Sequence, residues 1–217
     1  MNAPADSARL VAEQLDTTPW QPAGVAGPVQ VFSSTKLPAR VRGYRTVSEP
    51  ACNADDVAAF LGAQMLDAFA VLNDRFAFAE TLVQEPWIVR TGFTMPTGFR
   101  SREFVHSVVR HSDGDVHFVI YGVVDDAELP PPRPGFIRCP MHLSGQRITP
   151  LDDGRCRVEH LMTYELGGLV PHWAQNSVFH RGHVDAYVKE WSRLLTHFTT
   201  TPPTTATTST PGTRHAG

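Results

Sequence analysis

One stretch near the end of the chain constrains its fold more than any other. Residues 164–171, Tyr-Glu-Leu-Gly-Gly-Leu-Val-Pro, are followed by an amphipathic segment that continues to about residue 198. Adjacent glycines let a strand turn sharply without a Cβ clash, and proline suits the first turn of a helix. The apolar spacing of three and four residues then predicts one helix over 172–197, roughly 39 Å long and able to cross a whole sheet. The residues of this stripe are Val184, Tyr187, Val188, Trp191, Leu194, Leu195 and Phe198.

Size and charge limit the class of protein. With 217 residues, 41% of them hydrophobic, the chain fits one domain that buries about 70% of its unfolded surface. The net charge is -3 and the basic residues are scattered, so no nucleic-acid partner is expected. The first residues lack a basic segment with an apolar core behind it, and no run approaches roughly 20 apolar residues, so a cytoplasmic location is expected.

The cysteines predict neither a disulfide framework nor a zinc site. Cys52, Cys139 and Cys156 are odd in number and far apart in the sequence. We therefore expect three free thiols. His180 and His183 lie three residues apart on the predicted helix but lack an evident third and fourth ligand, so no metal and no cofactor is expected.

The rest of the chain changes from helical to strand periodicity and back. Helices are expected at 7–15 and 54–73, the second capped by Asn53. Strands are expected at 28–32, 39–47, 76–83, 87–93, 104–111, 116–124, 136–145 and 155–164. A proline-rich loop at 125–135 is either a lid or a plain surface excursion. We expect one domain over 1–198, followed by a disordered Thr/Pro-rich tail at 199–217, which has no large apolar residue.

Four blocks in this order resemble the START lipid-transfer domains, a family of the helix-grip, Bet v 1-like superfamily. Residues 102–105, Arg-Glu-Phe-Val, are similar to the family's Arg-Asp-Phe-Val, and 136–138, Phe-Ile-Arg, to its Tyr-Val-Arg. The Ser-Gly-x-x-Ile-x-Pro block is matched at 144–150, and Asp-x-x-Gly-x-Ile-Pro-x-Trp-Leu-x-Asn at 165–176. The resemblance covers about 20–195. It implies an α+β helix-grip fold, in which a curved antiparallel sheet wraps around a long C-terminal helix with an internal hydrophobic tunnel.

The sequence also departs from the family pattern. Leu72 and Asn73 stand where family members usually have Trp-Asp, and Glu103 and Glu165 replace aspartates. Val108 occupies the position at which the steroid-type members have a buried arginine. A sterol-type ion pair is therefore not carried over to this chain.

The resemblance places Val108 toward the tunnel, and strand alternation then selects the other lining residues. A second stripe on the closing helix, which includes Asn176, is also expected to face the tunnel. The expected ligand-binding residues are Trp87, Val89, His106, Arg110, Tyr121, Met141, Leu143, Asn176, Phe179 and His183. Most of the lining is apolar, which suits a hydrocarbon or ring-fused ligand.

Two of these side chains have alternative interpretations. If Arg110 is enclosed, its guanidinium needs a carboxylate, phosphate or carbonyl partner; otherwise it lies in water at the end of its strand. His106 could anchor a ligand hydroxyl or be satisfied by the backbone.

The sequence therefore favours binding, with intracellular transfer or sensing, of a hydrophobic small molecule that is lipid, sterol-like or polyketide-like. A transient membrane contact is considered as a second partner, and the oligomeric state is left open. The alternative is an enzyme of the polyketide cyclase or aromatase type, with an acid/base pair such as His106 with Tyr121 or Arg110 with His183. No recognised catalytic motif is present, so no catalytic residue is assigned.

Overall fold

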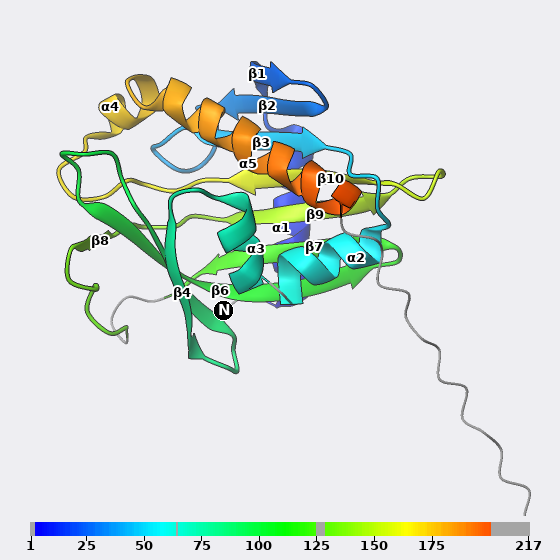
Figure 1. Cartoon of the computed structure of the whole chain (residues 1–217), viewed down its shortest axis with the longest axis horizontal. Coiled ribbons are helices and arrows are strands. Elements are labelled where there is room, and N and C mark those ends of the chain that lie inside the picture. The colour runs from blue at the N-terminus through cyan, green and yellow to red at the C-terminus, as the bar shows by residue number, and fades with distance from the viewer. Residues whose placement is uncertain (1–2, 64, 125–128, 201–217) are drawn as a thin grey trace, which may run out of the picture.

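The computed structural model describes residues 3–63, 65–124 and 129–200. Within them, ten strands form one curved sheet that wraps around a long C-terminal helix (Figure 1). The strands are β1 (Gln21–Ala26), β2 (Val29–Ser34), β3 (Gly43–Ser48), β4 (Phe76–Val83), β5 (Ile88–Phe93), β6 (Ser101–Asp113), β7 (Val116–Val123), β8 (Phe136–Arg138), β9 (Ser144–Pro150) and β10 (Cys156–Met162). The helices are α1 (Pro4–Thr17), α2 (Ala54–Ala58), the π-helix η1 (Ala59–Ala63), α3 (Met65–Leu72), α4 (His172–Ser177) and α5 (His180–Thr200).

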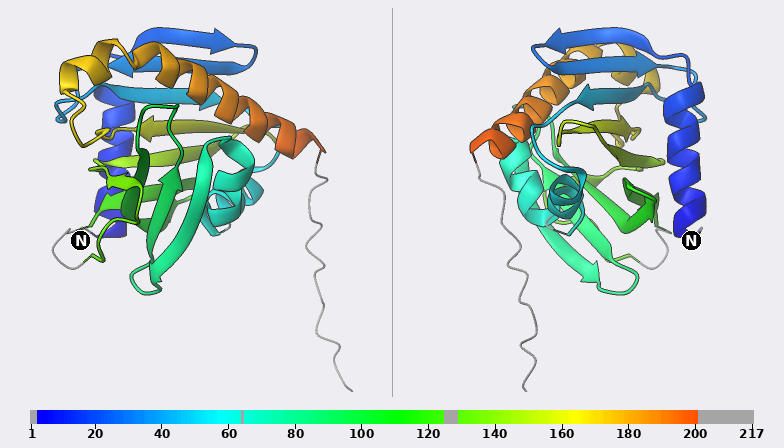
Figure 2. Two further views of the ribbon diagram at one scale, coloured as in Figure 1. Left: turned by 60° about the vertical axis from the view of Figure 1, so that its left-hand side comes forward. Right: turned by 90° about the vertical axis from the view of Figure 1, so that its right-hand side faces the viewer.

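The sheet is open and almost wholly antiparallel. Its order is β1-β2-β3-β10-β9-β7-β6-β5-β4, and the short β8 pairs in parallel with β6. Helix α5 crosses one face, together with α2, η1 and α3, while α1 covers the other (Figure 2). The fold is therefore the predicted helix-grip architecture. None of the described helices is both long and apolar enough to cross a bilayer.

Two apolar cores form because strand side chains alternate between the faces. On β7, Val119 and Tyr121 belong to the core under α5, whereas Phe118 and Ile120 belong to the core under α1. Trp191 and Leu194 of α5 are almost completely buried, as the predicted apolar stripe requires.

The predicted closing helix is interrupted near its start. The carbonyl oxygen of Ala174 accepts from the backbone N–H of both Val178 and Phe179, at 2.8 and 3.1 Å, and this change in the hydrogen-bond ladder separates α4 from α5. The glycine turn before it is confirmed, since Gly167 and Gly168 both have positive φ, at 63° and 62°.

Other boundaries differ from the predictions for local reasons. The predicted strand 136–145 contains β8 and only the first two residues of β9, and these are separate strands, since β8 pairs with β6 while β9 pairs with β7 and β10. The predicted helix 54–73 contains η1 in its middle. Strand β1 was missed because it contains Pro22 and Gly24, which an edge strand tolerates. A Cβ at Gly24 would lie 2.5 Å from Cγ1 of Val184, so glycine here allows α5 to pack closely.

The structure bears on the predictions for the cysteines and for the start of the C-terminal tail. Cys52, Cys139 and Cys156 are free thiols, as expected. Thr199 and Thr200 end α5, and the remainder of the predicted tail, 201–217, lies outside the described residues.

Candidate functional site

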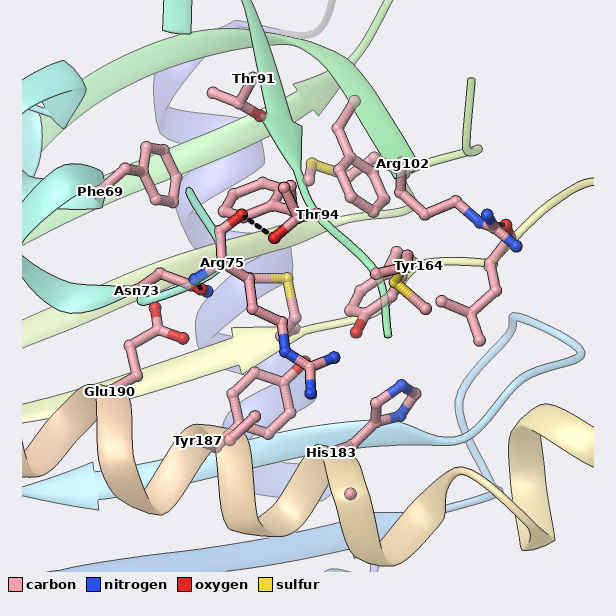
Figure 3. Close-up of a pocket in the computed structure, with 18 of the residues that line it drawn as sticks. Phe69, Asn73, Arg75, Thr91, Thr94, Arg102, Tyr164, His183, Tyr187 and Glu190 are labelled. Carbon is pink, nitrogen blue, oxygen red and sulfur yellow. Dashed lines mark hydrogen bonds between the residues drawn. The ribbon is translucent and has the colours of Figure 1, made fainter. Parts of the chain in front are cut away.

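A cavity of about 270 Å³ lies between α5, the end of α3 and the concave face of the sheet (Figure 3). Apolar and aromatic side chains, with three methionines among them, form most of its wall, and eight of the 22 lining residues are polar or charged. The lining residues are Phe69, Asn73, Arg75, Thr91, Phe93, Thr94, Met95, Pro96, Arg102, Phe104, His106, Tyr121, Met141, Met162, Tyr164, Leu166, Phe179, Gly182, His183, Ala186, Tyr187 and Glu190. A mostly apolar wall with a few polar groups is typical of small-molecule sites.

The structure brings five of the ten expected ligand-binding residues to this cavity. They are His106, Tyr121, Met141, Phe179 and His183. They come from strands β6 and β7, the segment between β8 and β9, the turn before α5, and α5 itself, so the tertiary fold gathers side chains that are far apart in sequence.

The other five lie elsewhere. Val89 is fully buried in the core, and Trp87 packs beside that core and donates from Nε1 to Oγ1 of Thr81 at 3.2 Å. Leu143 was placed on the wrong face, because the break between β8 and β9 resets the alternation and turns it toward the core under α1.

Asn176 and Arg110 also point away from the cavity. The Asn176 side chain accepts a hydrogen bond from the backbone N–H of Arg42 at 2.7 Å. The interruption between α4 and α5 separates Asn176 from the residues of α5 that line the cavity. Arg110 is exposed and its aliphatic stem packs over Gly62 of η1, so the alternative of a solvent-facing Arg110 is correct.

The inner end of the cavity holds polar groups that are deeply buried. His106 is 1% exposed, and neither of its ring nitrogens has a hydrogen-bond partner among the described residues. Its ring meets that of Tyr121 edge-on, with the centroids 5.2 Å apart. Burial lowers the pKa of His106 to about 4 and raises the pKa of Tyr121. At neutral pH both side chains are therefore uncharged and can exchange hydrogen bonds with a neutral polar group.

Behind them lies a second, much smaller space of about 20 Å³. Gln146 borders this space and donates from Nε2 to the hydroxyl of Tyr121 at 2.9 Å, while its buried Oε1 has no hydrogen-bond partner among the described residues. His160 also borders it, stacked at a tilt on Trp191, and burial lowers its pKa to about 3. A volume of this size with several polar partners suits one water molecule or one ligand hydroxyl.

Aromatic side chains also cluster under α5, where the ring of Tyr44 contacts those of His180, His183 and Tyr187. The Tyr44 hydroxyl lies 3.1 Å from Nδ1 of His183 and 3.2 Å from Nδ1 of His180, so it can donate to only one of them at a time. Burial, followed by the charge of His180, lowers the pKa of His183 to about 4. Tyr187 and Glu190 follow on the same helix, and burial raises the pKa of the half-buried Glu190 carboxyl to about 7.

The residues of the cavity that the sequence prediction missed include Arg75, Arg102, Tyr164 and Glu190. Glu190 carried a usable signal, because it lies four residues after Ala186 and so continues the second stripe of the closing helix. Arg75 carried none, since it occupies a short connection between α3 and β4 whose side-chain direction depends on the packing around it.

The described part of the proline-rich loop lies on the opposite face of the sheet. Glu103, adjacent in β6 to the cavity residue Phe104, is fully buried on that face and accepts from the backbone N–H of Arg133 at 2.9 Å. The carbonyl oxygen of Pro131 accepts from Arg90 at 3.1 Å. These contacts favour the surface alternative over a lid for residues 129–135; residues 125–128 lie outside the described part.

The open sheet gripping α5, with a cavity between them, defines the helix-grip class, and comparison with known proteins identifies the family. The family model described as START domain matches residues 90–201, more than half of the chain. The chain belongs to the START domain family. No curated protein matches it.

Solved structures share the fold at low sequence identity. Human STARD10 is 13% identical with a TM-score of 0.73, over 91% of this chain and 81% of that one. Human StAR-related lipid transfer protein 5 is 17% identical with a TM-score of 0.70, over 90% and 96%. The STAR-related lipid transfer protein of Xanthomonas axonopodis, as a fragment, is 21% identical with a TM-score of 0.69, over 83% and 98%.

Proposed function

We propose that this protein binds a hydrophobic small molecule of the lipid class in the cavity between α5 and the sheet, and carries it through water. The observation that supports the proposal most directly is the cavity of about 270 Å³ with its wall of aromatic and methionine side chains. Removing apolar surface from water contributes about 25 cal/mol per Å², so a ligand that covers this wall is held without any covalent step. Two of the similar structures are named as lipid transfer proteins, which agrees with this role.

Five of the originally expected residues remain proposed ligand contacts. Met141 and Phe179 supply apolar surface, while His106, Tyr121 and His183 supply polar atoms at the inner end and under α5. The other five expected residues are not proposed as ligand contacts. The cytoplasmic location stays a prediction.

The segment between the cavity residues Leu166 and Phe179 offers a surface for contact with the membrane that would supply the ligand. Leu169, Trp173 and Val178 are 101%, 69% and 66% exposed, and all belong to the segment that leads into α5. Phe99, 44% exposed, meets the cavity residue Phe179 edge-on, with ring centroids 5.7 Å apart. Exposed aliphatic and aromatic side chains grouped beside a ligand cavity favour transient insertion into a bilayer interface.

The alternative of a cyclase or aromatase receives weaker support. Arg110 does not line the cavity, so the pair Arg110 with His183 is not assembled there. His106 and Tyr121 are adjacent, but burial lowers the pKa of His106 to about 4 and raises that of Tyr121. Neither pKa is near neutral pH, where a general acid or base works best. Glu190 has a suitable pKa of about 7, without a second group of similar pKa in the described cavity wall.

A titration with Nile red, a neutral apolar fluorophore, tests the proposal. Ala186→Trp fills the cavity and should weaken binding of the dye by about tenfold or more, which is about 1.4 kcal/mol. Asp185→Trp, next to it on α5 but outside the cavity wall, is the matched control. If the wild type does not bind the dye, or if both variants weaken it equally, the cavity is not the binding site. Native mass spectrometry of the protein from its own host, followed by denaturing extraction, then identifies the natural ligand.

A further inference from the structure

Arg75 is an exposed, charged side chain that lines an otherwise mostly apolar cavity, which places it at the opening. It lies in the connection between α3 and β4, and its guanidinium extends toward Tyr187 and His183 (Figure 3). Its charge reaches the cavity wall. After burial and the charge of His180, it is the third cause that lowers the pKa of His183, and it partly offsets the rise that burial causes in the pKa of Tyr164.

The guanidinium of Arg75 forms no hydrogen bond or ion pair with any described residue. This distinguishes it from the buried arginines nearby: Arg102 donates to the carbonyl oxygen of Leu166, and Arg90 pairs with Glu80. Glu190 is the one carboxyl among the described lining residues, and it does not pair with Arg75.

The backbone of Arg75 is nevertheless held firmly. Its carbonyl oxygen accepts from the N–H of Thr94 at 2.7 Å and from the Thr94 hydroxyl at 3.2 Å, and its own N–H donates to Oδ1 of Asn73 at 2.9 Å. The preceding Asp74 forms ion pairs with Lys189 and Arg193 of α5. This connection is bonded both to the segment after β5 and to α5, so it holds the Cα of Arg75 in place, which lowers the entropy lost when a ligand binds.

A ligand made only of hydrocarbon that covers this guanidinium would remove its water and supply no hydrogen-bond acceptor, and this desolvation of a charged group is costly. A ligand with an anionic head restores the lost hydrogen bonds with charge-assisted ones, for which the planar guanidinium is well suited. We propose that the ligand is a single-headed anionic amphiphile whose carboxylate or phosphate is bound by Arg75, with its hydrocarbon against the aromatic wall. This inference rests on the proposed function and adds the chemical class of the ligand.

Isothermal titration with three amphiphiles of the same chain length tests it: dodecanoate, dodecyl phosphate and dodecanol. The wild type should bind one or both anions at least about tenfold more tightly than the alcohol, as expected for a hydrogen bond to a charged group. Tighter binding of dodecanoate would identify the head group as a carboxylate, and tighter binding of dodecyl phosphate would identify it as a phosphate. In Arg75→Gln this preference should disappear while the affinity for dodecanol changes less than about threefold.

Arg181→Gln is the control for net charge. Arg181 is exposed on α5 beside the cavity residue Gly182 but is not part of the cavity wall. An equal loss of anion binding in Arg181→Gln would mean long-range attraction and would overturn the assignment to Arg75. Equal affinity of the wild type for the anions and the alcohol would overturn the anionic ligand but leave the proposed function intact. Failure to bind any of the three would overturn both. The preference of the wild type for the anions over dodecanol is measured without any variant, so the anionic ligand can be tested even if Arg75→Gln does not fold.

Discussion

Arg102 donates a hydrogen bond from Nε to the carbonyl oxygen of Leu166 across 2.5 Å, joining β6 to the loop that leads into α4. Both residues are buried, at 3% exposure each. Cys139 donates to the same oxygen from Sγ at 3.1 Å, with its thiol kept protonated because burial raises its pKa to about 12. Two donors therefore fix the start of a loop whose tip, Leu169, is fully exposed.

Replacing the charged donor should loosen this loop. Arg102→Leu is expected to lower the free energy of unfolding by about 2 kcal/mol, the typical contribution of a hydrogen bond to a charged group. Amide hydrogen exchange should also become faster in residues 166–170. Arg100→Leu is the control, since Arg100 is exposed and donates to the carbonyl oxygen of Phe136; its effect should stay within about 0.5 kcal/mol. Equal effects of the two substitutions would contradict the role given to Arg102.

The buried histidines predict acid sensitivity. The folded-state pKa of His160 is lowered from 6.5 to about 3, so its contribution to stability is complete above pH 6.5 and is lost as the pH falls. At about pH 5 the loss is roughly 2 kcal/mol for this one group, relative to about pH 7. Urea unfolding at both pH values should show a smaller difference for His160→Leu than for the wild type. An unchanged pH dependence would mean that His160 can be protonated in the folded state.

Glu190 predicts the opposite dependence. Its folded-state pKa is raised from 4.5 to about 7, so the advantage of its protonated form is complete below pH 4.5 and is lost as the pH rises through 7. Glu190→Gln should therefore raise the free energy of unfolding of the ligand-free protein by about 2 kcal/mol near pH 8, and change it little near pH 5. Chemical unfolding at the two pH values measures this. A destabilised variant at the higher pH would show that the carboxylate has a favourable partner.

Two glycines should respond to alanine in opposite directions. Gly167 has a φ of 63°, and a Cβ there would lie 3.0 Å from the carbonyl oxygen of Arg138. Gly167→Ala should lower the free energy of unfolding by about 2 kcal/mol. Gly182, in α5, has nothing within 4 Å of an added Cβ, so Gly182→Ala should raise it by up to about 1 kcal/mol. Thermal and urea unfolding of both variants give the comparison, and a stabilised Gly167→Ala would contradict the turn geometry.

The proposed membrane contact depends on the exposed side chains of the segment between Leu166 and Phe179. The double variant Leu169→Glu with Trp173→Glu should reduce co-sedimentation with neutral phosphatidylcholine vesicles by about tenfold or more. Val25→Glu is the matched control, because Val25 is 70% exposed but lies on edge strand β1. Vesicle binding that is the same in both variants would place the contact elsewhere.

Local sequence patterns predicted much of the framework. The spacing of Tyr187, Trp191 and Leu194 indicated the buried stripe of α5, and these residues are all buried. The family resemblance supplied the inward face of Val108, strand alternation then selected His106 and Tyr121, and both line the cavity. Such patterns succeed because helix and strand periodicities are fixed by backbone geometry.

The tertiary structure decided which polar groups meet in the cavity. Leu143 and Asn176 left the expected stripes because one strand divides at 139–143 and the closing helix is interrupted after Ser177. The sequence prediction left open whether Arg110 is enclosed or lies in water; in the structure Arg110 is exposed, and Arg75, which is also exposed, contributes to the cavity wall instead. Periodicity determines the face of an element on which a side chain lies, and so the sequence by itself predicted the buried stripe of α5 and most of the strands. The curved sheet around that helix was implied by the family resemblance. The direction of a side chain in a short connection depends on contacts with distant elements. Here Arg75 accepts a backbone hydrogen bond from Thr94, and the preceding Asp74 forms ion pairs with Lys189 and Arg193 of α5. These contacts exist only once the chain has folded.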